Sequence, residues 1–138
     1  MTTVNARPVY KPTAPTPSTS AKRILIIDDE TDIGLLLSGL LRRLGYQPTC
    51  AHSMEEGRLC LNNQRFDAIF LDLNLPDGLG FDLLPLIRQD QQQAKVIMIS
   101  AFDGQAERRK AAEQGADDFI GKPFTRRSVE GALNKLWV

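Results

Sequence analysis

Short apolar runs alternate along this chain with stretches whose apolar residues recur at helical spacing, and this alternation is the strongest constraint on its fold. The pattern is typical of parallel strands joined by crossover helices. Five strand-and-helix pairs follow from residue 22 onward. The predicted strands are 24–27, 46–51, 68–71, 96–99 and 116–120. We therefore predict an α/β fold with a doubly wound, five-stranded parallel sheet.

The predicted strands differ in their apolar content, and this difference indicates their places in the sheet. The runs at 24–27, 68–71 and 96–99 are unbroken and aliphatic, as expected for central strands covered by helices on both faces. Pro48 removes a backbone hydrogen-bond donor from the strand 46–51. We expect that strand to lie at an edge.

The first and second helices carry clear start and stop signals. Gly45 follows the first apolar stripe and is placed to end that helix in the left-handed conformation. Ser53 and Glu56 resemble a capping box at the start of the second helix. The stripe expected to face the core from the first helix is Ile33, Leu36, Leu37, Leu40, Leu41 and Leu44.

The other three helices have less uniform signals. The third follows a glycine-rich loop at 76–80 and is marked by Phe81, Leu84 and Ile87. The fourth, 105–114, ends at Gly115 and contains mostly alanine and charged residues, so it offers little apolar area for packing. Thr125 is placed to cap the last helix. The inward residues of that helix are Val129, Leu133 and Leu136.

Residues 1–21 differ in composition from the rest of the chain. They contain four prolines and seven serine or threonine residues, with no acidic residue. We interpret this segment as a flexible tail and place the folded domain at 22–138. An organelle transit peptide is the alternative, but the prolines oppose the amphipathic helix that it needs.

Charge and cysteine content limit the classes of function. Seventeen Lys and Arg offset seventeen Asp and Glu, so no overall field attracts the chain to nucleic acid or to an anionic membrane. The apolar runs are far shorter than the ~20 residues of a membrane span. Cys50 and Cys60 form no paired pattern and are expected to be free structural thiols in a reducing cytoplasm.

Polar residues follow four of the predicted strands. Because parallel strands open their carboxyl ends on one edge, where ligands bind, we expect these residues to meet in one cleft. They are Asp28, Asp29 and Glu30 after the first strand, Asp72 after the third, Ser100 (followed by Ala101) after the fourth, and Lys122 (followed by Pro123) after the fifth.

The chemistry of such a cleft points to a cation and a phosphoryl group. Clustered carboxylates repel one another unless a cation or a lysine neutralises them. Oxygen ligands favour Mg²⁺ or Mn²⁺, and His52 is expected to lie away from this edge, at the surface. Mg²⁺ usually keeps a site for a phosphate oxygen. Asp72 is placed to attack phosphorus, while Lys122 absorbs the charge and Ser100 donates a hydrogen bond.

This constellation resembles the receiver domain of two-component response regulators, over residues 22–138. The resemblance implies a flavodoxin-like (βα)5 fold with strand order 2-1-3-4-5. It implies that Asp72 accepts a phosphoryl group from a histidine kinase, a histidine phosphotransfer protein or a small donor such as acetyl phosphate. The domain then acts as a self-phosphorylating and self-dephosphorylating switch rather than as a turnover enzyme.

The resemblance also assigns metal ligands. Asp29, Asp72 and the backbone carbonyl of Asn74 are expected to coordinate Mg²⁺ directly, and Asp28 through a water. Lys122 is expected to pair with Asp72 and later with its phosphate. The Lys122–Pro123 peptide bond is predicted to be cis, as is frequent in the family.

The switch residues implied by the resemblance are Ser100 and Phe119. Phosphate is expected to draw Ser100 inward, so that Phe119 turns inward and alters the face formed by the fourth helix, fifth strand and fifth helix. That face would contact a downstream protein or a second copy. Phe119 lacks a tyrosine hydroxyl, so we expect its inward position to depend on burial alone. Asn74 and Phe102 are expected to tune the phosphoryl lifetime, with Phe102 slowing hydrolysis.

Plainer roles are available to single residues of the constellation. Asp28 and Asp29 are also suited to cap the first helix, Asp72 to begin a turn and Lys122 to lie in an exposed loop. Basic residues on the last two helices are interleaved with acids, so we interpret them as a solvated face and expect no direct binding of nucleic acid. They are Arg108, Arg109, Lys110, Arg126 and Arg127.

Other functions remain as alternatives. The chain is also consistent with a phosphorelay intermediate, or with the receiver of a longer transcriptional regulator. An aspartyl phosphatase normally has a cap and an acid where Asn74 stands. A flavin-binding protein shares the sheet, but Asp28, Asp29 and Glu30 repel a cofactor phosphate. An adaptor that works without phosphorylation does not need the complete pocket.

Overall fold

Five parallel strands form a single sheet in the computed structural model, which describes residues 21–137. The order is β3-β2-β4-β7-β8, which confirms the predicted order 2-1-3-4-5 and the edge position of the strand that contains Pro48. Apart from Ala21, the predicted tail lies outside these residues. The strands are β2 (Arg23–Ile27), β3 (Gln47–Ala51), β4 (Ala68–Asp72), β7 (Lys95–Ser100) and β8 (Asp118–Gly121).

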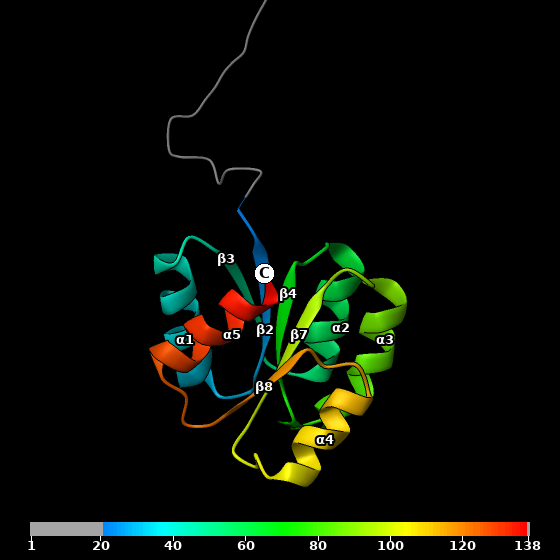
Figure 1. Ribbon diagram of the computed structural model, residues 1–138. Coiled ribbons are helices and arrows are strands. Elements are labelled where there is room, and N and C mark those ends of the chain that lie inside the picture. The colour runs from blue at the N-terminus through cyan, green and yellow to red at the C-terminus, as the bar shows by residue number, and fades with distance from the viewer. Residues whose placement is uncertain (1–20, 138) are drawn as a thin grey trace, which may run out of the picture.

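Helices cover both faces of the sheet. Figure 1 shows α1 (Thr31–Arg43) and α5 (Arg126–Leu136) on one side, and α2 (Met54–Asn63), α3 (Leu84–Asp90) and α4 (Gln105–Glu113) on the other. Alternate residues of the central strands enter opposite cores, as the two-residue period of a strand requires. On β2, Ile24 and Ile26 pack with the α1–α5 layer, whereas Leu25 and Ile27 pack with the other layer.

The buried stripe of α1 is rotated from the predicted one. Leu37 and Leu41 are fully buried, but Leu36 is 60% exposed, so its assignment to the core is wrong. Gly34 and Ser38 occupy part of the buried face, and the Ser38 Oγ lies 3.0 Å from the Cys50 Sγ. Small residues that a count of apolar side chains omits therefore direct this helix against β3. Gly45 has φ 94° and follows the helix as predicted.

The α2 helix begins with only half of the predicted capping box. The Ser53 Oγ accepts a hydrogen bond from the Glu56 N–H at 3.1 Å. The Glu56 carboxylate instead accepts from the His52 N–H at 2.8 Å. The carboxylate of Asp77 binds two other free N–H groups of the first turn, accepting from the Met54 N–H at 2.9 Å and from the next N–H at 3.2 Å. This residue therefore joins the helix to the segment that follows β4.

The predicted loop 76–80 contains short regular elements. Strands β5 (Asn74–Leu75) and β6 (Gly78–Leu79) pair antiparallel, and a 3-10 turn, Gly80–Leu83, leads into α3. The Gly80 N–H donates to the Leu73 carbonyl at 2.7 Å. A side chain at Gly80 would overlap the Asp72 carbonyl, so this position requires glycine.

The last two helices differ in packing as predicted. Ala111 is the buried residue of α4, so little apolar area holds this helix against the sheet. Thr125 and Ser128 form a complete capping box at the start of α5. The described helices include none that is long and apolar enough to cross a membrane.

Candidate functional site

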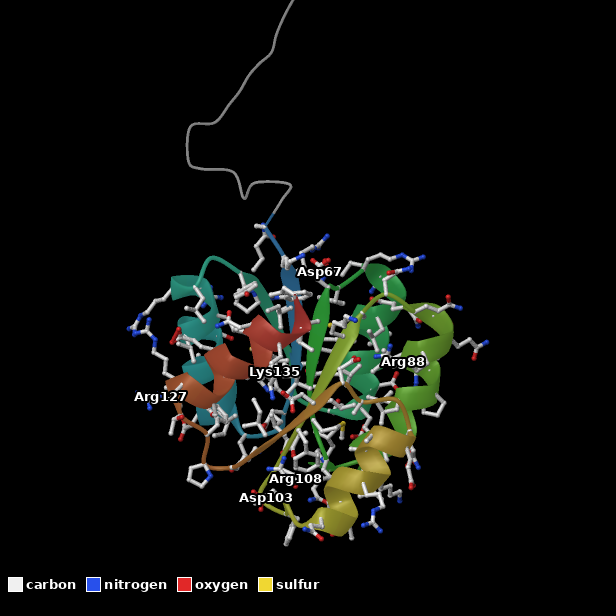
Figure 2. All side chains as sticks on the ribbon, viewed as in Figure 1. Asp67, Arg88, Asp103, Arg108, Arg127 and Lys135 are labelled. Carbon is white, nitrogen blue, oxygen red and sulfur yellow. The ribbon has the colours of Figure 1, made fainter. Side chains whose placement is uncertain are left out.

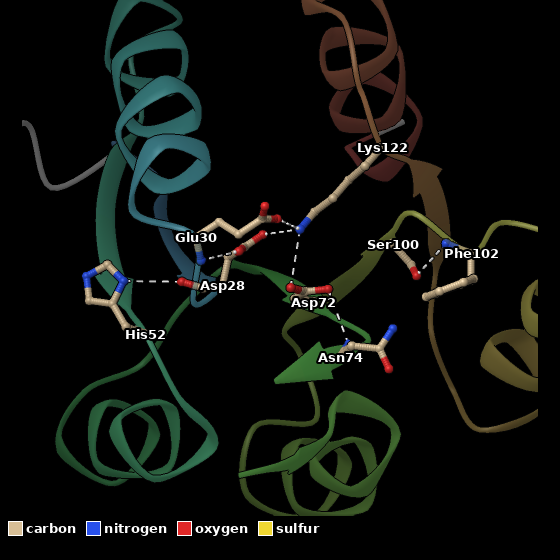
Figure 3. Close-up of polar contacts among 8 residues, drawn as sticks. All are labelled: Asp28, Glu30, His52, Asp72, Asn74, Ser100, Phe102 and Lys122. Carbon is tan, nitrogen blue, oxygen red and sulfur yellow. Dashed lines mark hydrogen bonds and ion pairs between the residues drawn. The ribbon is translucent and has the colours of Figure 1, made fainter. Parts of the chain in front are cut away.

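Acidic side chains from the ends of two strands converge on the ammonium of Lys122, which follows a third strand (Figure 3). Its Nζ lies 2.8 Å from Asp28 Oδ2, 3.2 Å from Asp72 Oδ2 and 2.7 Å from Glu30 Oε1. Asp28 follows β2, Asp72 ends β4 and Lys122 follows β8. Parallel strands bring these ends to one edge of the sheet, so the predicted cleft is present.

Asp28, Asp29 and Asp72 form a candidate divalent-cation site. Each offers a carboxylate oxygen, and these oxygens lie within 4.8 Å of one another. Asp28 and Asp72 are buried, whereas Asp29 is exposed. Carboxylate oxygens at this spacing suit Mg²⁺, Mn²⁺ or Ca²⁺ rather than zinc.

Hydrogen bonding around Asp28 is consistent with a cation. Its Oδ1 accepts from the Glu30 N–H at 2.8 Å, so one oxygen is fixed in direction. Its Oδ2 is buried, and its contact within residues 21–137 is the ion pair with the Lys122 ammonium at 2.8 Å. A carboxylate oxygen has more than one lone pair, so this ion pair leaves Oδ2 able to accept from a metal-bound water or to ligate the metal.

Burial and neighbouring charges shift the two central titrating groups. Burial, and then the charge of Asp28, raise the pKa of Asp72 from 3.8 to about 6, although Lys122 and the Asn74 N–H partly offset them. Burial alone lowers the pKa of Lys122, but the contacts with Asp28 and Glu30 and the charge of Asp72 outweigh burial and raise it. Lys122 therefore stays charged, and a bound cation would favour ionised Asp72.

Asn74 and Ser100 lie beside this cleft in different ways. The Asn74 N–H donates to Asp72 Oδ1 at 3.3 Å, which fixes the second oxygen of this carboxylate. Ser100 is fully buried at the end of β7, but its Oγ accepts from the Phe102 N–H at 2.9 Å. The Ser100 hydroxyl is thus hydrogen-bonded within the loop that follows β7 in this structure. The Phe102 side chain is 64% exposed.

Phe119 is buried in β8, with 7% of its surface exposed. The Arg108 guanidinium covers the ring, with Cζ 5.0 Å from its centroid, and donates to the Phe119 carbonyl at 3.2 Å. Arg108 also donates to the Asp103 carbonyl at 3.0 Å, and Figure 2 shows these two residues side by side. In this structure a cation covers the buried ring, and the expectation that burial alone holds Phe119 inward stays a prediction.

The sequence interpretation missed two residues at this edge. The sequence places Glu30 among the acids of the cleft without indicating its partner, which is Lys122 in the structure. His52 was expected away from the edge, yet its Nδ1 lies 3.2 Å from the Asp28 carbonyl, although its side chain is exposed. The signal was available in the strand order: β3 pairs with β2, so the residue after Ala51 lies beside the residue after Ile27. The Lys122–Pro123 bond is cis, as predicted.

Comparisons with known proteins agree with this geometry. Residues 24–134 match the model of the response regulator receiver domain family. The transcriptional regulatory protein GltR of Pseudomonas aeruginosa is 35% identical over 121 residues, which cover 86% of this chain and 50% of the relative. The response regulator protein PilR of the same species is 38% identical over 104 residues, covering 75% and 23%. The chain thus spans half or less of the length of these relatives.

Solved structures share the fold. A CheY-like receiver domain protein from Methanospirillum hungatei has a TM-score of 0.79 and 32% identity, with 85% of this chain and 94% of that chain covered. A response regulator from Burkholderia pseudomallei, with a phosphorylated aspartic acid, a calcium ion and citrate, has a TM-score of 0.77 and 28% identity, covering 81% and 66%. The chain therefore belongs to the response regulator receiver domain family, the signalling switches of two-component systems.

Proposed function

We propose that Asp72 is the phosphoryl acceptor of this receiver domain. The observation that carries the proposal is the contact of 3.2 Å between its Oδ2 and Lys122 Nζ, inside a cleft lined by further carboxylates. A carboxylate oxygen can attack phosphorus and become an acyl phosphate. The lysine is then within reach of the phosphoryl oxygens and neutralises part of their charge.

Asp28, Asp29 and Asp72, with the backbone carbonyl of Asn74, hold Mg²⁺ or Mn²⁺ in this proposal. Asp29 and Asp72 bind directly, and Asp28 binds through a water. The all-oxygen donor set and the convergence of these oxygens within 4.8 Å of one another support this assignment. When bound, such an ion supplies positive charge to the phosphoryl oxygens.

The phosphoryl donor in this proposal is a histidine kinase or a histidine phosphotransfer protein, and acetyl phosphate replaces it in vitro. Ser100 and Phe119 form the switch, and the face of α4, β8 and α5 contacts a downstream protein or a second copy of the chain. Asn74 and Phe102 tune the phosphoryl lifetime. The exposure of Phe102 near the buried Ser100 supports a role in this lifetime, because an apolar side chain there can hinder the water that attacks the phosphoryl group.

The functional unit we propose is residues 22–138, preceded by the tail 1–21 and located in the cytoplasm. It acts as a switch that modifies itself, rather than as a turnover enzyme. Cys50 and Cys60 are free, which is consistent with a reducing compartment. Binding of nucleic acid is not part of the proposal, because the basic and acidic residues of the whole chain balance.

Incubation with acetyl phosphate and Mg²⁺, followed by intact mass, tests the proposal. We expect a gain of one phosphoryl group that requires Mg²⁺ and is lost in Asp72→Asn. Asp82→Asn is the matched control, because Asp82 is exposed in the turn before α3. A label that persists in Asp72→Asn, or steady phosphate release without a labelled intermediate, would contradict the proposal. Chromatography before and after labelling tests self-association.

A further inference from the structure

The Glu30 side chain does not make the hydrogen bond that is usual for a residue at its position. Glu30 is the N-cap residue of α1, where a short polar side chain usually accepts a hydrogen bond from the first turn. It makes no such bond. Its Oε1 instead lies 2.7 Å from Lys122 Nζ, across the mouth of the cleft, although 58% of the Glu30 side chain is exposed. Figure 3 shows this side chain directed toward the lysine.

Three carboxylates share the one ammonium group, and they are not equivalent. The contact with Asp72 is the longest, at 3.2 Å, against 2.8 Å for Asp28 and 2.7 Å for Glu30. Asp28 and Asp72 belong to the trio whose oxygens converge as a candidate cation site, and Glu30 does not. A cation therefore draws on the first two carboxylates and leaves Glu30 as a partner of the lysine.

We propose that Glu30 restrains phosphorylation by small anionic donors, because it competes for Lys122. The inference rests on the proposed role of Asp72. In the transfer from acetyl phosphate, a bond forms between an Asp72 oxygen and phosphorus while the phosphorus–oxygen bond to the acetyl group breaks. Acetate leaves with the electron pair. Lys122 must turn from Glu30 to the phosphoryl oxygens, so the strength of this ion pair adds to the barrier.

The expected effect is modest, because one partner of the ion pair is exposed. We expect the initial rate of labelling to rise about two- to fivefold in Glu30→Gln, which removes the charge and keeps the size. Glu30→Asp keeps the charge but shortens the side chain, and it should give a similar gain. Asp32→Asn is the control for net charge: Asp32 lies in the first turn of α1 and is not among the partners of Lys122.

Rates are measured by intact mass with acetyl phosphate and saturating Mg²⁺. A rate in Glu30→Gln at or below that of the wild type would overturn the proposal. A gain in Glu30→Gln without a gain in Glu30→Asp would overturn it as well, because repulsion of the anionic donor would then be the cause. Equal gains in Asp32→Asn and Glu30→Gln would also overturn the proposal, because loss of any negative charge near the donor would then explain the faster labelling.

A second measurement does not depend on phosphorylation. In metal-free protein, the ammonium protons of ¹⁵N-labelled Lys122 are expected to exchange faster with water in Glu30→Gln than in the wild type. An unchanged exchange rate would refute the competition. Wild-type protein that gains no phosphoryl group would refute the proposed function. Wild-type protein labelled at Asp72, with no faster labelling in Glu30→Gln, would refute only the role of Glu30.

Discussion

Lys122 and Asp72 lie 50 positions apart in the chain, yet the lysine Nζ reaches the carboxylate Oδ2 at 3.2 Å. The contact passes over the end of β7, which separates the two parent strands β4 and β8 in the sheet. Asp28 shares the same lysine. One ammonium thus compensates two buried carboxylates, and this charge balance gives the site its dependence on pH, metal and mutation.

Replacing Lys122 by Met is expected to destabilise the metal-free domain at neutral pH. The change leaves Asp28 and Asp72 buried without a counter-charge, and breaking a buried pair costs about 3–5 kcal/mol. Urea unfolding at pH 7.5 in EDTA measures the loss. Lys135→Met is the control, since Lys135 pairs with Asp118 at the surface and should cost less than about 1 kcal/mol. Equal losses in the two variants would contradict the buried-pair argument.

Asp72→Asn is expected to stabilise the metal-free domain above pH 6. Because the pKa of Asp72 is raised to about 6, the folded state holds a proton that the unfolded state has released between about pH 4 and 6. The free energy of unfolding of the wild type therefore falls as pH rises through this range. Asparagine stays neutral and avoids this loss. At pH 7.5 the free energy of unfolding of Asp72→Asn should therefore exceed that of the wild type by about 1–3 kcal/mol.

The check is urea unfolding of both proteins from pH 4 to pH 8, with EDTA throughout. The difference between them should be small at pH 4 and reach its maximum above pH 7. Asp82→Asn should follow the wild type across the range, because Asp82 is exposed. A destabilised Asp72→Asn protein at pH 7.5 would show that the ion pair with Lys122 outweighs the desolvation of the carboxylate.

Affinity for Mg²⁺ should decrease as pH falls through 6. A cation binds the carboxylate, so protonated Asp72 must lose its proton first, and below its pKa the affinity should fall by about tenfold per pH unit. Isothermal titration calorimetry at pH 5, 6 and 7.5 measures this change. Asp29→Asn should weaken binding at every pH, whereas Asp32→Asn should not. An affinity independent of pH would place Asp72 outside the metal site.

The sequence predicted the sheet and the cleft because both follow from the chain's periodicity. Unbroken aliphatic runs mark central strands, and residues after parallel strands must share an edge, so Asp28, Asp72 and Lys122 were assigned together. The direction of Glu30 and Arg108 was not predictable in this way. Their long side chains contact elements that are distant in the sequence, and the spacing of residues along the chain does not indicate which element each will contact.

The orientation of α1 was missed for a related reason. Leu36 fits the helical stripe as well as Leu37 does, and the apolar pattern alone cannot separate them. The choice depends on Gly34 and Ser38, which let the helix approach Cys50 on the edge strand. Close packing of small residues is a property of two surfaces together, so one element's sequence does not display it.

Arg108 is expected to hold Phe119 in its buried position. Its guanidinium covers the ring and donates to the carbonyls of Phe119 and Asp103, which ties α4 to β8 and to the loop after β7. Arg108→Ala removes these contacts, and we expect about 0.5–1 kcal/mol less stability together with greater mobility of the ring. Arg108→Lys keeps the charge but not the paired hydrogen bonds, and its effect should be intermediate.

Arg109→Ala is the control, because Arg109 is exposed on the same helix. Aromatic side-chain NMR of labelled phenylalanine reads the ring directly, and an unchanged Phe119 signal in Arg108→Ala would mean that burial alone is sufficient.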